Sequence, residues 1–216
     1  FNAFGTIKPN VFGLSESINK VYNIMSGIPK EKLYLNRNGV NTKAFAFTTT
    51  PDHPEASIYL AKIDYRKRQH LFQSIDSLWY AGNIADNRFN QNKNYMGEWT
   101  KQRLYANLTQ YGNLVLLSDG EAHSLVIMEA LAAGLGVVVS EFATANLDLD
   151  KEFITVIPEK KISDIAFVEE QIIKNRKYSI QHREEIREYG MQFDWTETIK
   201  NVFIPNVEKL IANGQK

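Results

Sequence analysis

Two glutamates with seven residues between them, Glu121 and Glu129, form the arrangement in this sequence with the clearest chemical potential. Every other residue from 125 to 133 is apolar, so the helix expected there should be buried on nearly all sides. A carboxylate in such a helix is costly unless it is paired or hydrogen-bonded. Glu129 therefore either forms a salt bridge with a neighbouring strand or accepts hydrogen bonds from the hydroxyls of a ligand.

The same segment predicts an anion site. Residues 113–118 indicate a strand, which a glycine-containing turn connects to the helix at residues 124–133. The helix N-terminus then lies beyond the carboxyl end of the strand, where open α/β sheets bind ligands. Its free N–H groups and positive dipole end favour an anion such as a diphosphate. Glu121 alone could be a capping residue, but with Glu129 about two turns inside the helix the pair favours a binding function.

The elements that must position these residues read as alternating strands and helices, typical of βαβ units with a mostly parallel sheet. Residues 48–55 contain two prolines and read as a linker. Gly190 should interrupt a charged helical region that starts at residue 163. We expect strands at residues 11–15, 32–35, 57–63, 77–81, 113–118 and 137–140, and helices at residues 16–25, 68–75, 100–111 and 124–133.

The composition is that of a globular protein, with 44% hydrophobic and 23% charged residues among 216. The 25 basic and 25 acidic residues balance, so no global field attracts nucleic acid or an anionic membrane, and a bound anion needs a local site. The lack of cysteine excludes disulfides, thiolate zinc sites and a cysteine nucleophile. No histidine cluster has metal-ligand spacing, and no apolar run reaches the roughly 20 residues of a membrane span.

Glu121 and Glu129, followed by Ala-Leu-Ala-Ala-Gly-Leu-Gly-Val-Val-Val-Ser, are similar to the E-x7-E signature of glycosyltransferase family 4 and its relatives, the "glycosyl transferases group 1". Further segments resemble that family in the same order along nearly the whole chain. They are Asn38-Gly39-Val40-Asn41 with Phe45, residues 59–67, residues 77–82, Met96-Gly97, and Phe193-Asp194-Trp195. The resemblance implies the two-domain GT-B architecture, with a Rossmann-like parallel sheet and flanking helices.

Within that architecture the resemblance assigns three regions to the chain. Residues 1–44 would be a remnant of the N-terminal acceptor domain and the junction, residues 45–190 the nucleotide-sugar donor-binding domain, and residues 191–216 the C-terminal crossover helix. The sequence starts at Phe1, with neither an initiating Met nor a signal pattern, so we expect that it begins inside a longer protein. The chain alone would then be inactive.

The activity that the resemblance implies is retaining hexosyl transfer from a nucleotide diphosphate sugar, such as UDP- or GDP-hexose. It implies no cofactor and no metal, because lysines would supply the positive charge. The acceptor, whether glycan, lipid or protein, stays open. We expect no nucleic-acid partner, a cytosolic location, and at most peripheral membrane contact through the missing domain.

The resemblance also implies a diphosphate clamp at Lys62 and Lys67, supported by His123, Ser124 and Leu125 at the start of the helix. Lys62 stands where the family has arginine, so the charge is kept but the bidentate fork is lost. A short basic run is otherwise usually solvated surface, and this alternative applies to Lys67. His123, a histidine at a helix start, could also be a cap or a catalytic group.

The two glutamates receive separate roles from the resemblance. Glu121 would be catalytic, holding sugar hydroxyls near the reacting carbon, and Glu129 would bind the ribose. Met96 and Gly97 would contact the nucleobase. Two other functions stay open, because a fold can outlive its chemistry. One is a non-catalytic nucleotide-sugar-binding module, and the other is a related GT-B phosphorylase or epimerase.

Overall fold

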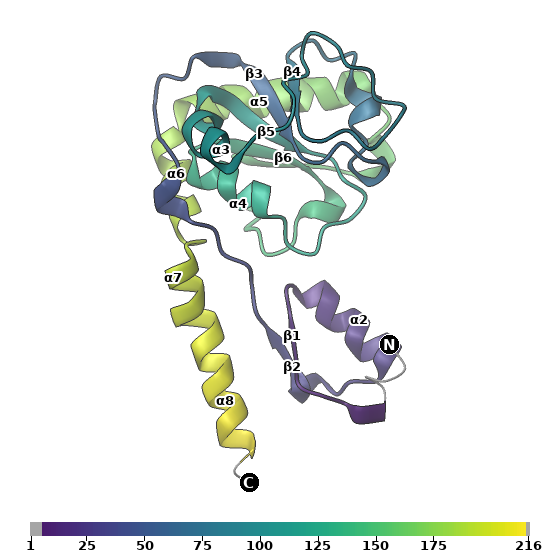
Figure 1. The fold of residues 1–216 in the computed structure, drawn as a ribbon, viewed down its shortest axis with the longest axis vertical. Helices are drawn as coiled ribbons and strands as arrows, with labels where there is room; N and C mark the ends of the chain where they lie inside the picture. Colours follow the sequence, from purple (N-terminus) through teal and green to yellow (C-terminus); the bar gives the residue numbers. More distant parts are fainter. Residues whose placement is uncertain (1–5, 215–216) are drawn as a thin grey trace.

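A five-stranded parallel sheet forms the larger part of the molecule, as the computed structural model, which describes residues 6–214, shows (Figure 1). The α/β class predicted from the sequence is thus confirmed. The strand order is β4-β3-β5-β6-β7, and every neighbouring pair is parallel. The strands are β3 (His53–Leu60), β4 (Leu78–Ala81), β5 (Tyr111–Leu116), β6 (Gly136–Ser140) and β7 (Ile154–Ile157).

Helices cover both faces of this sheet. All residues of β5 and β6 are buried, which is typical of parallel strands enclosed on two sides. One face is crossed by α5 (Ile165–Gln181), which packs on β3, β5, β6 and β7. The helix α4 (Leu125–Ala132) packs on β5, β6 and α6 (Arg183–Met191), and Figure 1 shows α3 (Lys101–Asn107) beside it. From β3 the chain adds β4 on one side, and then β5 on the other side of β3. The strand order therefore reverses between β3 and β5, which creates a switch point.

Local signals place several elements correctly. Ser124 is the N-cap of α4, and Gly134 follows the helix with a φ of 81° that suits glycine. Thr100 caps α3 as expected, because its hydroxyl accepts a hydrogen bond from the Arg103 N–H at 3.2 Å. The α-helix ends at Asn107 and continues as a 3₁₀ turn, Leu108–Gln110, rather than reaching residue 111, because Tyr111 already belongs to β5.

Other expectations were wrong, and each has a physical reason. The helix expected at residues 68–75 is two 3₁₀ turns, Tyr65–Lys67 and Gln69–Phe72, because Arg68 between them has a left-handed φ of 59°. The expected linker at residues 48–55 overlaps β3, whose register shifts after His53, where a proline is tolerated.

Two further differences come from packing that local patterns do not reveal. Gly190 does not interrupt α6. A Cβ there would lie 2.3 Å from the Leu131 carbonyl carbon of α4, so glycine allows the two helices to approach closely. The edge strand β7, which the sequence pattern does not indicate, pairs with β6 from Ile154 to Ile157.

A small βαβ unit lies apart from the large sheet (Figure 1). Strands β1 (Val11–Gly13) and β2 (Leu33–Leu35) are parallel and are connected by α2 (Glu16–Ser26). The first five residues of the predicted remnant lie outside the described residues, so the comparison with residues 1–44 starts at residue 6. A two-stranded sheet is marginal alone, so this unit depends on neighbouring elements.

The C-terminal segment runs alongside the connection between the two parts (Figure 1). It consists of α7 (Trp195–Thr198), a π-helical turn (Ile199–Phe203) and α8 (Ile204–Gly214). The side-chain amide of Asn206 donates to the carbonyl of Leu35 at 2.6 Å, which joins α8 to the βαβ unit. Within residues 6–214, no helix is long and apolar enough to cross a membrane.

Candidate ligand-binding site

The switch point of the sheet lies beside a cavity of about 500 Å³. Its walls come from the ends of β3 and β4, from the start of α3 and from α4. The polar side chains on these walls include Lys62, Glu98, Lys101 and Glu129. The carboxyl ends of parallel strands are where open α/β sheets bind ligands, so the cavity occupies the expected place for a site.

Glu129 is buried on α4 and paired, as its apolar surroundings require. Its side chain is 8% exposed, and its Oε1 lies 2.7 Å from Nζ of Lys101. The salt bridge that the sequence left as one alternative is therefore present, but its partner is on α3 and not on a strand. Because Glu129 and Lys101 both line the cavity, the pair is also placed to contact a ligand.

Glu121 forms an ion pair with Lys67, and each side chain is 14% exposed. Its backbone N–H donates to the carbonyl of Phe142 at 3.0 Å, and the start of α4 has no side-chain cap. The structure therefore gives Glu121 an ion-pairing role and not a capping one. Glu121 also lines a second cavity of about 480 Å³, together with Glu141 and with Ser15 and Ser17 of the βαβ unit region.

Tyr59 fixes the position of Lys67. Its hydroxyl donates to the carbonyl of Lys67 and accepts from the N–H of Leu117 at 2.8 Å, so it joins the segments that follow β3 and β5. Complete burial raises the pKa of Tyr59 far above its ordinary value, which keeps the hydroxyl protonated. The carboxylate of Asp64 accepts from the N–H of Lys67 at 3.1 Å and caps the 3₁₀ turn.

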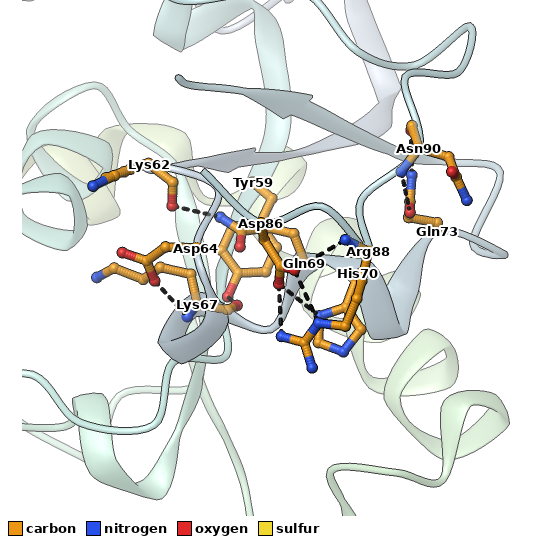
Figure 2. A network of polar contacts seen from close by, with 10 residues as sticks. All are labelled: Tyr59, Lys62, Asp64, Lys67, Gln69, His70, Gln73, Asp86, Arg88 and Asn90. Carbon is orange, nitrogen blue, oxygen red and sulfur yellow. Dashed lines mark hydrogen bonds and ion pairs between the residues drawn. The ribbon is translucent and has the colours of Figure 1, made fainter. Parts of the chain in front are cut away.

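A second network holds the segment that carries Lys62, as Figure 2 shows. The side-chain amide of Gln69 donates to the carbonyl of Lys62 at 3.0 Å. Asp86 accepts from Arg88 at 2.7 and 2.9 Å and lies 3.4 Å from His70. The guanidinium of Arg88 lowers the pKa of Asp86 to about 2, so this carboxylate is ionised at neutral pH.

The two lysines of the predicted clamp are therefore held by their backbones but differ in their side chains. Lys67 is engaged by Glu121. The side chain of Lys62 is exposed, extends away from the network in Figure 2 and lines the cavity. It forms no ion pair within the described part of the chain. Its ammonium group is the more accessible of the two for an anion.

Arg68 was not predicted as part of the site. It forms ion pairs with Asp119 at 3.0 Å and with Glu159 at 2.8 Å. The Asp119 N–H also donates to the Arg66 carbonyl at 2.7 Å, so the segment after β3 is bound to the turn that carries Glu121. The run of basic residues at 66–68 indicated that Arg68 could bind an acidic group, but its partners Asp119 and Glu159 are distant in the sequence.

His123 contacts the junction between the two parts of the molecule. The ring is buried, and its Nδ1 accepts from the backbone N–H of Asn38 at 3.0 Å. Burial, with a smaller effect of Arg37, lowers the pKa of His123 to about 4, so the ring is neutral at pH 7. Because Nδ1 accepts a hydrogen bond, the proton is on Nε2, which has no partner among residues 6–214.

The remaining predicted residues lie close to the site in different ways. Ser124 and Leu125 form the start of α4. Neither Met96 nor Gly97 is among the residues that line the 500 Å³ cavity, whereas the next residues along the chain are. The sulfur of Met96 accepts from the Tyr111 hydroxyl at 3.0 Å, and the carbonyl of Gly97 accepts from a backbone N–H at 3.0 Å. Their assignment to the nucleobase stays a prediction.

Groups of three or more histidine, aspartate or glutamate side chains that could hold a metal ion do not occur among the described residues. The polar groups of the site are instead carboxylates, lysines and arginines, in pairs that join β3 to β5 and α3 to α4. This arrangement can bind hydroxyl groups through the carboxylates and an anion through the cations.

No protein-family model matches the chain, and no curated protein matches its sequence significantly. Solved structures match its fold. HepE of Anabaena, in a complex with UDP-glucose, has a TM-score of 0.70 at 13% identity, over 92% of this chain and 63% of HepE. WaaG, a glycosyltransferase involved in lipopolysaccharide biosynthesis, has a TM-score of 0.70 at 13% identity, over 89% of this chain and 61% of WaaG.

A glycosyltransferase from Rickettsia africae has a TM-score of 0.72 at 15% identity, over 97% of this chain and 68% of that protein. The chain spans less than two thirds of the length of HepE and of WaaG. At these identities the likeness establishes the fold. Over the part that it covers, this chain has the fold of the GT-B glycosyltransferases, with their Rossmann-like parallel sheet.

Proposed function

We propose that this chain carries the donor site of a retaining glycosyltransferase that transfers a hexose from a nucleotide diphosphate sugar to an acceptor. The observation that carries the proposal is a pair of carboxylate–lysine contacts at the switch point, Glu121 with Lys67 and Glu129 with Lys101. Lys62, which has no ion-pair partner among the described residues, lines the same cavity as the second pair. The UDP-glucose in the HepE structure and the UDP with GlcNAc in that of a pneumococcal O-GlcNAc transferase support this choice of donor.

The cations of the site define the role proposed for the diphosphate. When the bond between the anomeric carbon and the diphosphate oxygen breaks, negative charge builds up on the leaving group. Lys62 and Lys67, with the backbone N–H groups at the start of α4, would stabilise that charge without a metal ion. Lys67 would then turn from Glu121 to the phosphate, or contact both.

The two glutamates have separate roles in this proposal. Glu129, in the second turn of the buried helix α4, would accept a hydrogen bond from the ribose at the 500 Å³ cavity. Glu121, beside the second cavity, would hold hexose hydroxyls near the reacting carbon. A non-catalytic nucleotide-sugar-binding module would keep the first role and lack the second.

Calorimetry with bare UDP and GDP separates the roles. Glu129→Gln should weaken binding of the nucleotide by about tenfold or more, because one charge-assisted hydrogen bond contributes roughly 1.5–3 kcal/mol. Glu121→Gln should leave the affinity unchanged or raise it, since Lys67 loses its carboxylate partner and becomes available to phosphate.

Turnover then tests the catalytic part. In the protein together with its acceptor half, Glu121→Gln should lower single-turnover transfer by about tenfold or more. Equal losses of nucleotide affinity in both variants would contradict the division of roles. Normal turnover of the Glu121 variant would show that Glu121 is not catalytic, whereas nucleotide binding without transfer by the wild type would favour the binding module.

A further inference from the structure

Lys101 and Glu129 present a joint polar surface to the 500 Å³ cavity. Oε1 of Glu129 is bonded to the ammonium of Lys101 at 2.7 Å, and no hydrogen bond to Oε2 occurs among the described residues. An ammonium group has three donors, of which this contact uses one. The Lys101 side chain is 60% exposed, whereas that of Glu129 is 8% exposed. One acceptor and free donors therefore lie side by side at the cavity.

This surface has the chemistry of a vicinal diol site. Each hydroxyl of a cis-diol can donate one hydrogen bond and accept others. One hydroxyl can donate to Oε2 of Glu129, while its neighbour accepts from Lys101. Because Lys101 already donates to Oε1, its ammonium lies beside the carboxylate, and the two groups together can contact both hydroxyls.

Lys101 is held in position by its own helix. It is the first residue of α3, and the preceding Thr100 caps that helix through the Arg103 N–H. The guanidinium of Arg103 lies 4.9 Å from the Trp99 ring, which also lines the cavity wall. The ammonium group thus starts from a fixed backbone, although the side chain is long.

We infer that Lys101 is a specificity-determining residue that recognises the ribose diol of the donor nucleotide together with Glu129. The inference rests on the proposed function, because it takes the ligand of this cavity to be a nucleoside diphosphate. It assigns to Lys101 a direct contact with one ribose hydroxyl, beyond the neutralisation of a buried carboxylate.

The test is calorimetry with UDP and GDP and with the 2′-deoxy and 3′-deoxy analogues of whichever binds. The wild type should prefer the ribonucleotide to at least one analogue by about tenfold, as expected for the loss of a charge-assisted hydrogen bond. Lys101→Met should reduce the preference over the analogue that lacks the Lys101-bound hydroxyl to about twofold or less, while the affinity for that analogue stays the same. Lys101→Arg, which keeps the charge and the pair with Glu129, should retain most of the preference.

Lys93→Met is the matched control, because Lys93 also pairs with a carboxylate, Asp76, and its side chain is 77% exposed. It should behave as the wild type. Equal weakening of ribo- and deoxynucleotides by Lys101→Met would overturn the inference and leave Lys101 as a partner of Glu129 only. A wild type that binds neither UDP nor GDP would overturn the proposed function, and the inference with it.

Discussion

Burial of single polar residues determines much of the chemistry of this site. The pattern of apolar residues around Glu129 predicted a buried carboxylate that needs a partner, and the structure supplies Lys101. The identity of the partner was beyond the sequence, because the two residues are 28 positions apart on different helices. The same holds for Tyr59, whose two hydrogen bonds to Lys67 and Leu117 exist only in the folded sheet.

His123 makes a prediction about pH. Its pKa is lowered from 6.5 to about 4 in the folded protein, so the unfolded chain binds the proton more readily between these values. Stability should therefore fall as the pH drops from about 6.5 to 4, by on the order of 3 kcal/mol at about 1.4 kcal/mol for each unit of pKa. Above pH 6.5 the ring is neutral in both states and contributes no pH dependence.

Urea unfolding of the wild type and of His123→Gln at several pH values checks this. The glutamine side chain can still accept from the Asn38 N–H, so the variant should lack the slope between pH 6.5 and 4 that His123 contributes. Nitrogen chemical shifts of the ring at pH 7 should show the proton on Nε2. Parallel stability curves, or a charged ring at pH 6, would contradict the prediction.

Elements were predictable where local signals define them. Ser124 and Gly134 delimit α4 in the sequence as in the structure, and apolar runs locate β5 and β6. The 3₁₀ turns after β3 were missed because the left-handed Arg68 interrupts the helix, and side-chain hydrogen bonds, such as that from Gln69 to the Lys62 carbonyl, hold the turns. Gly190 was misread because its function is close packing against α4, which no local pattern reports.

Tyr59 gives a test at the level of the strands. Tyr59→Phe removes the hydroxyl that joins the segments after β3 and β5, and leaves the Leu117 N–H and the Lys67 carbonyl without their partner. Each buried group left unpaired costs about 1–3 kcal/mol, so the free energy of unfolding should fall by roughly 2 kcal/mol or more. Denaturant unfolding measures this change.

Tyr80→Phe is a close control, because Tyr80 is also fully buried, on β4, with its ring 6.2 Å from that of Tyr59. Its hydroxyl has no hydrogen-bond partner in the described chain. Its removal should leave the stability unchanged or increase it, since no partner is lost. Similar losses in both variants would show that the hydroxyl of Tyr59 does not join the two segments as proposed.

At the scale of the whole molecule, a compact joint connects the βαβ unit to the large sheet. Val40 pairs with Asp194, and the Val40 carbonyl accepts from the Trp195 N–H at 3.1 Å. The hydroxyl of Thr42 donates to the buried Asp194 at 2.7 Å. A Cβ on Gly39 would lie 2.9 Å from the Cα of Trp195, so the two segments touch directly.

Asp194 should stabilise this joint more than the sheet. Its second oxygen accepts from the Thr196 N–H at 2.9 Å and caps α7. Asp194→Ala removes this cap, which contributes about 1 kcal/mol. It also leaves the buried Thr42 hydroxyl unpaired, at a further cost of about 1–3 kcal/mol. Hydrogen exchange should accelerate in residues 38–42 and in α7, while β5 and β6 stay protected. Asp194→Asn keeps one oxygen that can accept from the Thr196 N–H, and its amide group can donate to the Thr42 hydroxyl oxygen, so it should show a smaller change. Equal acceleration of exchange in residues 38–42, in α7 and in the central strands would mean that Asp194 supports the global fold. The joint would then have no separate stability.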